Sequence, residues 1–230
     1  MYREWTGALK LSPLFRGIDD ESLNIMLDCL KPKVRRYRQR EVIALYSQPF
    51  SGIGIITGGK VSLTRETYSG ERMLMGILDE GDIFGETAAF SENPVWTATV
   101  IAQEETCVLF LPPDKVRTTC SNICASHNTL IGNMLRILSE RALMLDKKME
   151  HTSARNIRGK ISSYLLDICH RYSSDTFRVS LKRHELADYL NIPRPSLSRE
   201  MCSMRDDGII EFKGTLVSVK NRHALENSVR

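Results

Sequence analysis

The chain has 230 residues, enough for one large domain or two modest ones, and its 42% apolar content supports a packed core. No run approaches the roughly 20 apolar residues that span a bilayer, and the first residues lack the charged start and long apolar stretch of a secretory signal. Six cysteines without a tight spacing pattern favour free thiols in a reducing compartment. We therefore expect a cytoplasmic protein with no membrane partner.

The net charge of +4 is unevenly distributed along the chain. Residues 153–230 hold 14 Lys and Arg against 9 Asp and Glu, a net charge of +5, whereas residues 1–152 carry a net −1. A basic segment attached to a neutral remainder is typical of a nucleic-acid-binding module joined to another domain. A solvated basic surface without a partner has the same composition, so charge alone does not decide.

Residues 12–30 predict a loop followed by a small helix. Asp19 or Asp20 can cap that helix, and apolar residues recur inside it at helical spacing: Leu23, Met26, Leu27 and Leu30. From about residue 33 to 113 the pattern changes to short strands, "EVIALY", "GIGIITGG", "KVSLTRE", "RMLMGIL" and "TCVLFL", separated by segments rich in turn-forming residues. Many short strands at even spacing indicate a small antiparallel barrel or jelly roll.

After Pro112 and Pro113 the apolar period becomes helical. Six apolar residues repeat at alternating intervals of four and three positions: Ile131, Leu135, Leu138, Ala142, Leu145 and Met149. Charged residues flank this seam, as they do in two-stranded coiled coils. We therefore expect residues 126–152 to form a long helix that pairs with a second copy of the chain. Packing of the seam on the chain's own domain is an alternative, and both arrangements can hold.

Residues 153–223 predict a winged helix-turn-helix domain. A helix and a short strand precede the ten-residue helix "LKRHELADYL". The next helix begins in "NIPRPSLSREM", because proline is tolerated in the first helical turn, and it ends before Gly208. Two short strands around Lys213 and Gly214 follow. The order of helix, tight turn, helix and hairpin is that of the winged helix-turn-helix.

In this motif the first residues of the second helix meet base edges in the major groove. We expect Arg194 and Arg199 to read bases, since a bidentate arginine–guanine pair contributes roughly 1–3 kcal/mol of discrimination, and Ser196 and Ser198 to bond a base or a phosphate. The positive end of the helix dipole and free N–H groups favour a phosphate at the same place. Backbone phosphates are the expected partners of three further cations: Lys182, Arg183 and Lys213.

Four segments of the chain carry a family resemblance. "RHELADYLNIPRPSLSREMCSMRDDGIIEFKG" resembles the DNA-binding helix-turn-helix of the Crp/Fnr family of bacterial transcription regulators, and "SPLFRGI", "GIGIITGGKVSLTRE" and "DEGDIFGETAAF" resemble its N-terminal half. The resemblance implies an α+β fold with three parts: a jelly-roll-like β-roll effector domain at 12–125, a dimerisation helix at 126–152 and a winged helix-turn-helix at 153–223. It also implies a homodimer that binds a near-palindromic double-stranded DNA operator, contacts RNA polymerase and is switched by an effector.

One position of the second helix departs from the family pattern. Arg194 and Arg199 match two base-reading arginines of the family, whereas Pro195 stands where many members carry a base-reading glutamate. The cytosine contact of that glutamate is therefore lost, which puts the family's usual half-site in doubt.

The resemblance places an effector pocket at Gly85, Glu86, Thr87, Trp96, Thr97 and Met134. In relatives that bind cyclic AMP, a glutamate takes a ribose hydroxyl, and an Arg-Ser or Arg-Thr pair holds the phosphate. Glu86 matches the glutamate, but Trp96-Thr97 stands at the pair, so the arginine is missing. A buried phosphate without its cation is costly, and we expect that cyclic AMP is not the effector. Trp96 either packs in the core or lines a pocket for an uncharged or aromatic molecule.

Cysteines and histidines suggest weaker sensor hypotheses. An iron–sulfur cluster is not expected, because Cys29 is the one cysteine near the N-terminus. Cys120, Cys124 and His127, at i, i+4 and i+7, would share a helix face and could bind a metal or act as a redox switch. Three ligands suffice only with a fourth from elsewhere, and a solvent-facing His127 without such a role is the favoured interpretation. His170, beside a cysteine, is a weak candidate haem ligand.

The sequence contains no nucleophile elbow, P-loop, zinc-protease signature or dinucleotide fingerprint, so we expect no enzyme. The favoured function is a dimeric DNA-binding regulator controlled by a small molecule or a redox signal. The alternative is a sensory module whose β-roll does the work and whose basic domain docks a protein. Salt-sensitive duplex binding would separate these two.

Overall fold

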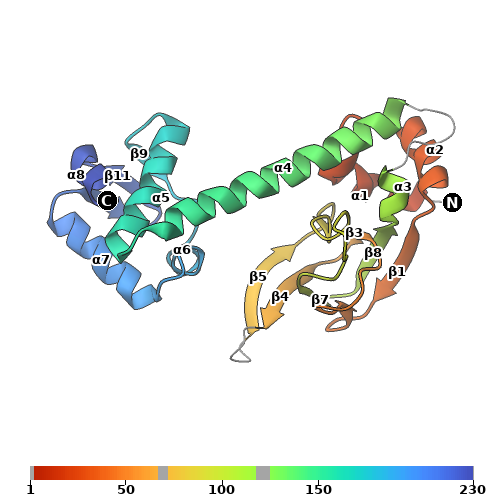
Figure 1. The fold of residues 1–230 in the computed structure, drawn as a ribbon, viewed down its shortest axis with the longest axis horizontal. Helices are drawn as coiled ribbons and strands as arrows, with labels where there is room; N and C mark the ends of the chain where they lie inside the picture. The colour runs from red at the N-terminus through yellow and green to blue at the C-terminus, as the bar shows by residue number, and fades with distance from the viewer. Residues whose placement is uncertain (1–2, 67–71, 118–124, 230) are drawn as a thin grey trace. The chain divides into compact units, whose positions relative to one another are not determined.

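The computed structural model describes residues 3–66, 72–117 and 125–229. The chain divides into two compact units, Met1–Glu140 (unit 1) and Arg141–Arg230 (unit 2). The long helix α4 (Ala125–Ser153), green in Figure 1, contributes its first part to unit 1 and its last turns to unit 2. Among the helices of the described residues, none combines the length and the apolar character that crossing a membrane requires.

Unit 1 begins with short helices: η1 (Arg3–Trp5), α1 (Thr6–Leu11), η2 (Pro13–Phe15) and α2 (Asp20–Leu30). Asp19 caps α2, because its carboxylate accepts the N–H of Ser22 at 3.0 Å, and this hydrogen bond lowers the pKa of Asp19. The four apolar residues that the sequence placed on one face of α2 are all buried. The predicted cap and helix are confirmed.

The strands of unit 1 form two four-stranded antiparallel sheets, which confirms the predicted β-roll. One sheet has the order β1-β8-β3-β6 and the other β2-β7-β4-β5. Sequence-distant strands are neighbours: Ile53 on β3 pairs with Leu111 on β8, and the two strands lie side by side in Figure 1. The strands are β1 (Lys33–Tyr37), β2 (Val42–Ala44), β3 (Ile53–Gly58), β4 (Val61–Glu66), β5 (Arg72–Leu78), β6 (Ile83–Phe84), β7 (Thr99–Ala102) and β8 (Thr106–Leu111).

Each strand of the first sheet serves two apolar cores. Successive residues of a strand point to opposite faces, so Ile55 joins a cluster with the helices while Ile56 joins a cluster inside the roll. The helix-side cluster includes residues of α1, α2 and α4, whereas the cluster inside the roll is rich in aromatic rings. The two sheets and the helices therefore form one continuous unit.

The first half of α4 is fixed to unit 1. It follows α3 (Pro113–Arg117), and it buries Leu130, Met134 and Ile137 in the helix-side cluster. The Asn133 side chain is also buried, and its Nδ2 donates to the carbonyls of Leu14 at 3.0 Å and Arg16 at 2.8 Å. The inner face of α4 thus satisfies backbone acceptors as well as apolar packing.

Unit 2 has the predicted winged helix-turn-helix topology. Its helices and strands are α5 (Ile157–Tyr172), β9 (Thr176–Arg178), α6 (Arg183–Tyr189), α7 (Arg194–Asp206), β10 (Ile210–Lys213), β11 (Leu216–Val219) and α8 (Arg222–Asn227). The strands pair in the order β10-β11-β9. Leu186, Leu197 and Met201 of the two helices of the motif lie in a single core with α5 and the sheet.

Candidate nucleic-acid interface and effector domain

A tight turn sets the direction of α7. Asn191 adopts a left-handed conformation with φ 53°, and the N–H of Ile192 then bonds the carbonyl of Ala187 at 3.0 Å. The Ile192 side chain is buried, which anchors the turn in the core of unit 2. The chain therefore leaves α6 and enters α7 in one defined geometry, as the helix-turn-helix motif requires.

The inner face of α7 packs and its outer face is open. Leu197, Met201 and Met204 are buried. By helical periodicity Pro195 and Arg199 lie on the opposite side, and both are exposed. Arg199 makes a long hydrogen bond to the Ser196 hydroxyl, 3.4 Å from Nη2 to Oγ, so its guanidinium remains available to a ligand. Arg194 is exposed as well, and Ser198 is partly exposed.

The first turn of α7 offers few free amide groups. Pro193 is the N-cap, and its carbonyl accepts the N–H of Ser196 at 2.9 Å and of Leu197 at 3.0 Å. Pro195 has no N–H to give. Among the described residues of this turn, only Arg194 has a backbone N–H that makes no backbone hydrogen bond. A phosphate at this helix end would therefore be bound mainly by side chains, whereas the sequence led us to expect free backbone N–H groups.

Two of the three predicted phosphate contacts are exposed lysines. Lys182 is the N-cap of α6, where its own N–H donates to Glu185 Oε2 at 2.5 Å while its ammonium faces solvent. Lys213 is exposed where the β10–β11 hairpin turns. These positions can receive a phosphate.

Arg183 differs from the other predicted DNA-binding residues. Its guanidinium lies 4.9 Å from the centre of the Phe212 ring and contacts the sulfur of Met201. Burial lowers the pKa of Arg183. Arg183 thus packs between α6, α7 and the wing, and its side chain has a structural role that sequence spacing did not indicate.

A fourth side chain on the outer face of α7 was not predicted. Cys202 lies three positions after Arg199, is a free thiol and is partly exposed. The helical period of "SREMC" places it there, but cysteine is not a usual base-reading residue and gave no signal.

The structure brings only some of the predicted effector-pocket residues together: Gly85 lies against the Trp96 ring, whereas Met134 lies in a different cluster. Trp96 is buried inside the roll, where its ring centre lies 4.6 Å from that of Phe50 and 5.9 Å from that of Phe84. Met134 is buried in the other, helix-side cluster. Glu86 is buried, whereas Thr87 and Thr97 are exposed. Of the two alternatives for Trp96, packing in the core is therefore the one that its buried position fits.

Gly85 is required by this aromatic packing. Its φ of 83° is a conformation that side chains rarely adopt, and an added Cβ would lie 2.7 Å from ring atoms of both Phe50 and Trp96. The Phe-Gly-Glu segment thus allows two aromatic rings to pack against the backbone at this corner of the roll.

Sequence reasoning missed an arginine next to Thr97. Arg65 on β4 donates from Nη2 at 2.8 Å and from Nε at 3.2 Å to the Thr97 carbonyl, and its guanidinium lies 5.8 Å from the centre of the Tyr46 ring. Sheet pairing brings these residues together across 32 positions of sequence, so no local motif marks them.

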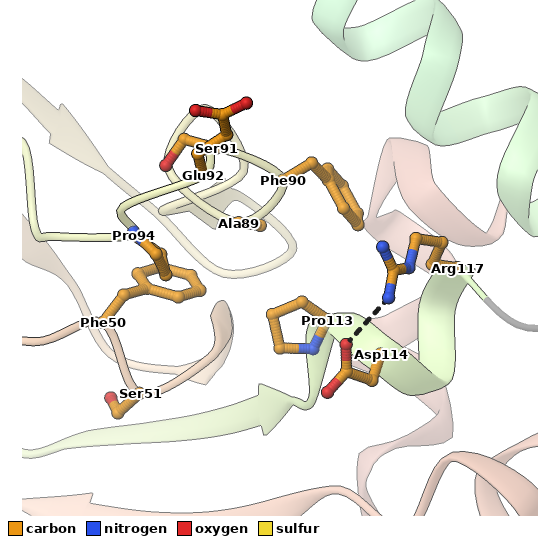
Figure 2. A pocket seen from close by; sticks show the side chains of 10 residues that line it. All are labelled: Phe50, Ser51, Ala89, Phe90, Ser91, Glu92, Pro94, Pro113, Asp114 and Arg117. Atoms are coloured by element: carbon orange, nitrogen blue, oxygen red, sulfur yellow. Dashed lines mark hydrogen bonds and ion pairs between the residues drawn. The ribbon is translucent and has the colours of Figure 1, made fainter.

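A hollow of about 400 Å³ lies at a different place in unit 1, and Figure 2 shows the side chains that line it. The rings of Phe50, Phe90 and Pro113 line it, and Asp114 pairs with Arg117 at its edge, 3.5 Å from Oδ1 to Nη2. None of the predicted effector residues lines this hollow.

The predicted dimer seam has two environments. Ile131 and Leu138, in the first half of α4, are partly buried. Leu135 is 60% exposed, Leu145 62% and Met149 70%, and Ala142 is also exposed. Leucine and methionine at such exposure form an apolar stripe along one side of α4.

The histidines and cysteines are only partly described. Cys120 and Cys124 lie outside the described residues. His127 is buried, which corrects the expectation that it faces solvent, and among the described residues neither of its ring nitrogens has a hydrogen-bond partner. Within the described part of the chain, no three metal-ligating side chains come together. His170 is exposed.

Comparisons with known proteins agree with this architecture. The model of the cyclic nucleotide-binding domain family matches residues 34–122, and that of the Crp-like helix-turn-helix domain family matches residues 159–228. The chain is 23% identical to the Cyclic AMP receptor protein of Thermus thermophilus, over 95% of this chain and 97% of that protein. It is 22% identical to the Global nitrogen regulator of Synechocystis sp., over 94% of this chain and 93% of that protein.

A solved structure shows the same fold. The Catabolite Activator Protein of Thermus thermophilus aligns with a TM-score of 0.57 and 22% identity, over 95% of this chain and 98% of that one. A cyclic nucleotide-binding β-roll in unit 1, the long helix α4 and a Crp-like helix-turn-helix in unit 2 follow one another in the same order as in these relatives. The chain belongs to the Crp/Fnr family of transcription regulators.

Proposed function

We propose that the chain is a homodimeric, sequence-specific DNA-binding transcription regulator whose affinity for its operator is set by an effector bound in unit 1. The observation that carries the proposal is the outer face of α7, where Arg194, Pro195 and Arg199 are exposed on a helix whose other side is packed into the core. Two outward arginines on a rigid helix fit the major groove, where arginine pairs with guanine.

The exposed stripe on α4 supports the dimer. Ala142, Leu145 and Met149 continue the seam into unit 2, and large apolar side chains at this exposure are stabilised when a second copy covers them. A two-fold dimer presents two copies of α7, so the operator is near-palindromic with half-sites about one helical turn apart. Genomic DNA as the target places the regulator in the cytoplasm, and contact with RNA polymerase is part of this proposal.

The proposed half-site differs from that of family members that carry a base-reading glutamate at the position of Pro195. Pro195 occupies the outer face of α7 and offers no hydrogen bond, so a cytosine contact at this position is absent. Discrimination then rests on the two arginines and on Ser198, with Lys182 and Lys213 contributing phosphate contacts.

The effector is a molecule other than cyclic AMP. Trp96 stands at the position of the phosphate-binding arginine, and its indole is packed between Phe50 and Phe84. A cyclic phosphate at this place would meet an aromatic core, and the guanidinium of the neighbouring Arg65 already donates to the Thr97 carbonyl. An effector that favours one arrangement of the dimer helices would shift the population that binds DNA.

The direct test is selection from a pool of random duplexes by the purified, reduced protein, followed by sequencing of the retained molecules. We expect a palindromic consensus containing guanines. Arg199→Ala should remove preference at one position of each half-site, a loss of roughly 1–3 kcal/mol per contact. Lys182→Ala should weaken binding equally on all duplexes and reduce the salt dependence.

Two outcomes would overturn the proposal. One is equal loss on every duplex for both variants, which would mean that Arg199 does not read bases. The other is retention of no consensus, both with the protein alone and with a cell extract that supplies small molecules. The second outcome would favour the alternative, in which unit 2 docks a protein.

A further inference from the structure

A buried cluster of three rings joins the end of α4 to the helix-turn-helix. His151, in the last turns of α4, is 1% exposed, and its Nδ1 lies 2.9 Å from the Tyr189 hydroxyl at the end of α6. The Tyr164 ring of α5 stands edge-on to the imidazole at 5.5 Å, and the two tyrosine rings are 5.6 Å apart. All three residues belong to unit 2.

The second nitrogen of His151 makes no hydrogen bond to any of the described residues. Nε2 is fully buried without a hydrogen bond, and Oδ2 of Asp167 lies 3.9 Å away, beyond hydrogen-bond distance. That carboxylate is already held by Lys147 Nζ and Arg171 Nη2, each at 2.7 Å. The His151 imidazole therefore lies next to a carboxylate whose negative charge Lys147 and Arg171 already compensate.

This geometry selects one form of the neutral ring. If Nε2 carries the hydrogen, the N–H points towards Asp167 and the Tyr189 hydroxyl donates to the lone pair of Nδ1. The opposite tautomer would turn a lone pair towards the carboxylate. Protonation gives Nδ1 a hydrogen as well, so the Tyr189 hydroxyl could no longer donate to it and would have to accept instead. The contact to Tyr189 can form with either partner as donor, whereas a charged ring would be buried without a hydrogen bond at Nε2 among the described residues, and this burial favours neutral His151.

We propose that His151 is a positioning residue that, in its neutral form, holds α6 against the end of α4 through Tyr189 and so keeps the helix-turn-helix in its DNA-binding arrangement. This inference rests on the proposed function. Protonation of His151 loosens the contact between α4 and α6 and weakens DNA binding. His151 touches no nucleotide and acts only through the placement of α6 and, across the turn, of α7.

The surrounding charges determine the direction of the pH effect. Burial lowers the pKa of His151 below its usual 6.5 and outweighs Asp167 and Glu150, which raise it, while Lys147 and Arg171 lower it further. The tyrosines stay neutral, because burial raises the pKa of Tyr189 and raises that of Tyr164 to about 12. The ammonium of Lys148 adds a positive charge 5.6 Å from the centre of the Tyr189 ring.

A lowered pKa in the folded state means that the unfolded or loosened state binds the proton more tightly. The stabilisation by His151 is therefore fully present above about pH 6.5 and is lost as the pH falls from 6.5 towards the lowered pKa of the folded form. If the loosened histidine has an ordinary pKa, the equilibrium constant for loosening rises by up to about tenfold between pH 7.5 and 5.5.

The same helix carries the proposed dimer contact on another face. Leu145 and Met149 are exposed, whereas His151 is buried against α5 and α6. The last turns of α4 can thus contact a second copy and the helix-turn-helix at once. A change in the packing of the two α4 helices of the dimer would therefore be transmitted to α6 through the contact between His151 and Tyr189, which depends on the protonation of His151.

The first experiment needs no DNA. The pKa of His151 is measured by NMR titration of its ring Cε1–H, and hydrogen exchange of amides 183–206 is followed at pH 7.5 and 5.5. We expect a pKa below 6.5 in the wild type and loss of protection at pH 5.5. A pKa at or above 6.5, or protection that does not change with pH in the wild type, would overturn the proposal.

Three variants separate positioning from general stability. His151→Asn keeps a hydrogen-bonding atom near the Nδ1 position but does not titrate, and Tyr189→Phe removes the hydroxyl while leaving the ring. Tyr164→Phe is the matched control, since it removes a hydroxyl from the same cluster that does not bond His151. If His151→Asn does not fold, Tyr189→Phe carries the test. We expect protection that is independent of pH in the first two variants and unchanged pH dependence in the control.

The second experiment measures affinity for the duplex selected from the random pool at both pH values, in a His184→Gln background that removes the exposed histidine of α6. We expect binding to weaken by up to about tenfold at pH 5.5 with His151 and Tyr189 intact, and the change to disappear in His151→Asn and Tyr189→Phe. Equal pH dependence in all variants would overturn the proposal. Absence of any selected duplex would contradict the proposed function, while the exchange measurements would still decide whether His151 holds α6.

Discussion

Arg158 on α5 forms an ion pair with Glu200 on α7, with 2.5 Å between Nε and Oε1. The same guanidinium reaches Asp207 at the end of α7, 2.8 Å from Nη2 to Oδ2. These contacts raise the pKa of Arg158, so its charge is permanent. Arg158 Nη2 also donates to the Ser203 hydroxyl at 2.9 Å, so one arginine holds the proposed recognition helix at three points, Glu200, Ser203 and Asp207.

Replacing Arg158 should lower the stability of unit 2. Because the pair is about three-quarters withdrawn from solvent, we expect Arg158→Gln to cost about 1 kcal/mol or slightly more in urea unfolding. Arg222→Gln is the matched control, since its pairs with Asp175 and Glu226 are longer and more exposed. Equal losses for the two variants would mean that the contact with α7 adds nothing beyond a surface ion pair.

Arg183 should behave as a packing residue rather than a phosphate contact. Arg183→Met keeps an unbranched side chain against Phe212 but loses the cation–π contact, so we expect reduced stability, by about 1 kcal/mol, with an unchanged salt dependence of DNA binding. Lys213→Ala should instead reduce the slope of log K against log salt by about 0.9. The same reduction in Arg183→Met would show that Arg183 neutralises a phosphate.

The exposed stripe on α4 should hold the dimer together. Leu145→Lys places a charge in the middle of the seam, and we expect sedimentation velocity to show a monomer at concentrations where the wild type is a dimer. Leu11→Lys is the control, because Leu11 is equally exposed, at 67%, but lies on α1. A dimer that survives Leu145→Lys would place the interface elsewhere.

The aromatic cluster of the roll should be essential for unit 1. Trp96→Ala removes a buried indole from contact with Phe50 and Phe84, and we expect a loss of about 3–5 kcal/mol in stability. Gly85→Ala should also destabilise, because its Cβ would meet the rings of Phe50 and Trp96. Circular dichroism during urea unfolding measures both.

The same cluster predicts the response to cyclic AMP. Millimolar cyclic AMP should leave the thermal midpoint of the wild type unchanged, since a ligand stabilises only a protein to which it binds. A rise of several degrees that Trp96→Ala abolishes would contradict the proposed absence of cyclic AMP binding.

Local pattern was sufficient for most of the helices and several strands. The strands "RMLMGIL" and "TCVLFL" were predicted at their observed limits, and the cap of α2 is Asp19, one of the two aspartates that the sequence offered. Three strands were not predicted as separate strands: β1, β6 and β7. Strand β1 is charged and lies at an edge of its sheet, and β6 has only two residues, so neither has a clear apolar pattern. Helix α8 was also missed, because it has only six residues and most of them follow residue 223, the expected end of the domain.

The sequence by itself determined the family through the resemblance of four segments to known regulators. It also determined the order of strand-rich domain, long helix and winged helix-turn-helix and the outward arginines of α7, because these depend on the spacing of neighbouring residues. Only the tertiary structure placed Arg183 against Phe212, Trp96 between Phe50 and Phe84, and Tyr189 against His151. Those contacts join residues of different helices and strands. Whether a side chain packs inside or reaches a ligand depends on what surrounds it, and sequence periodicity gives only the direction in which it points.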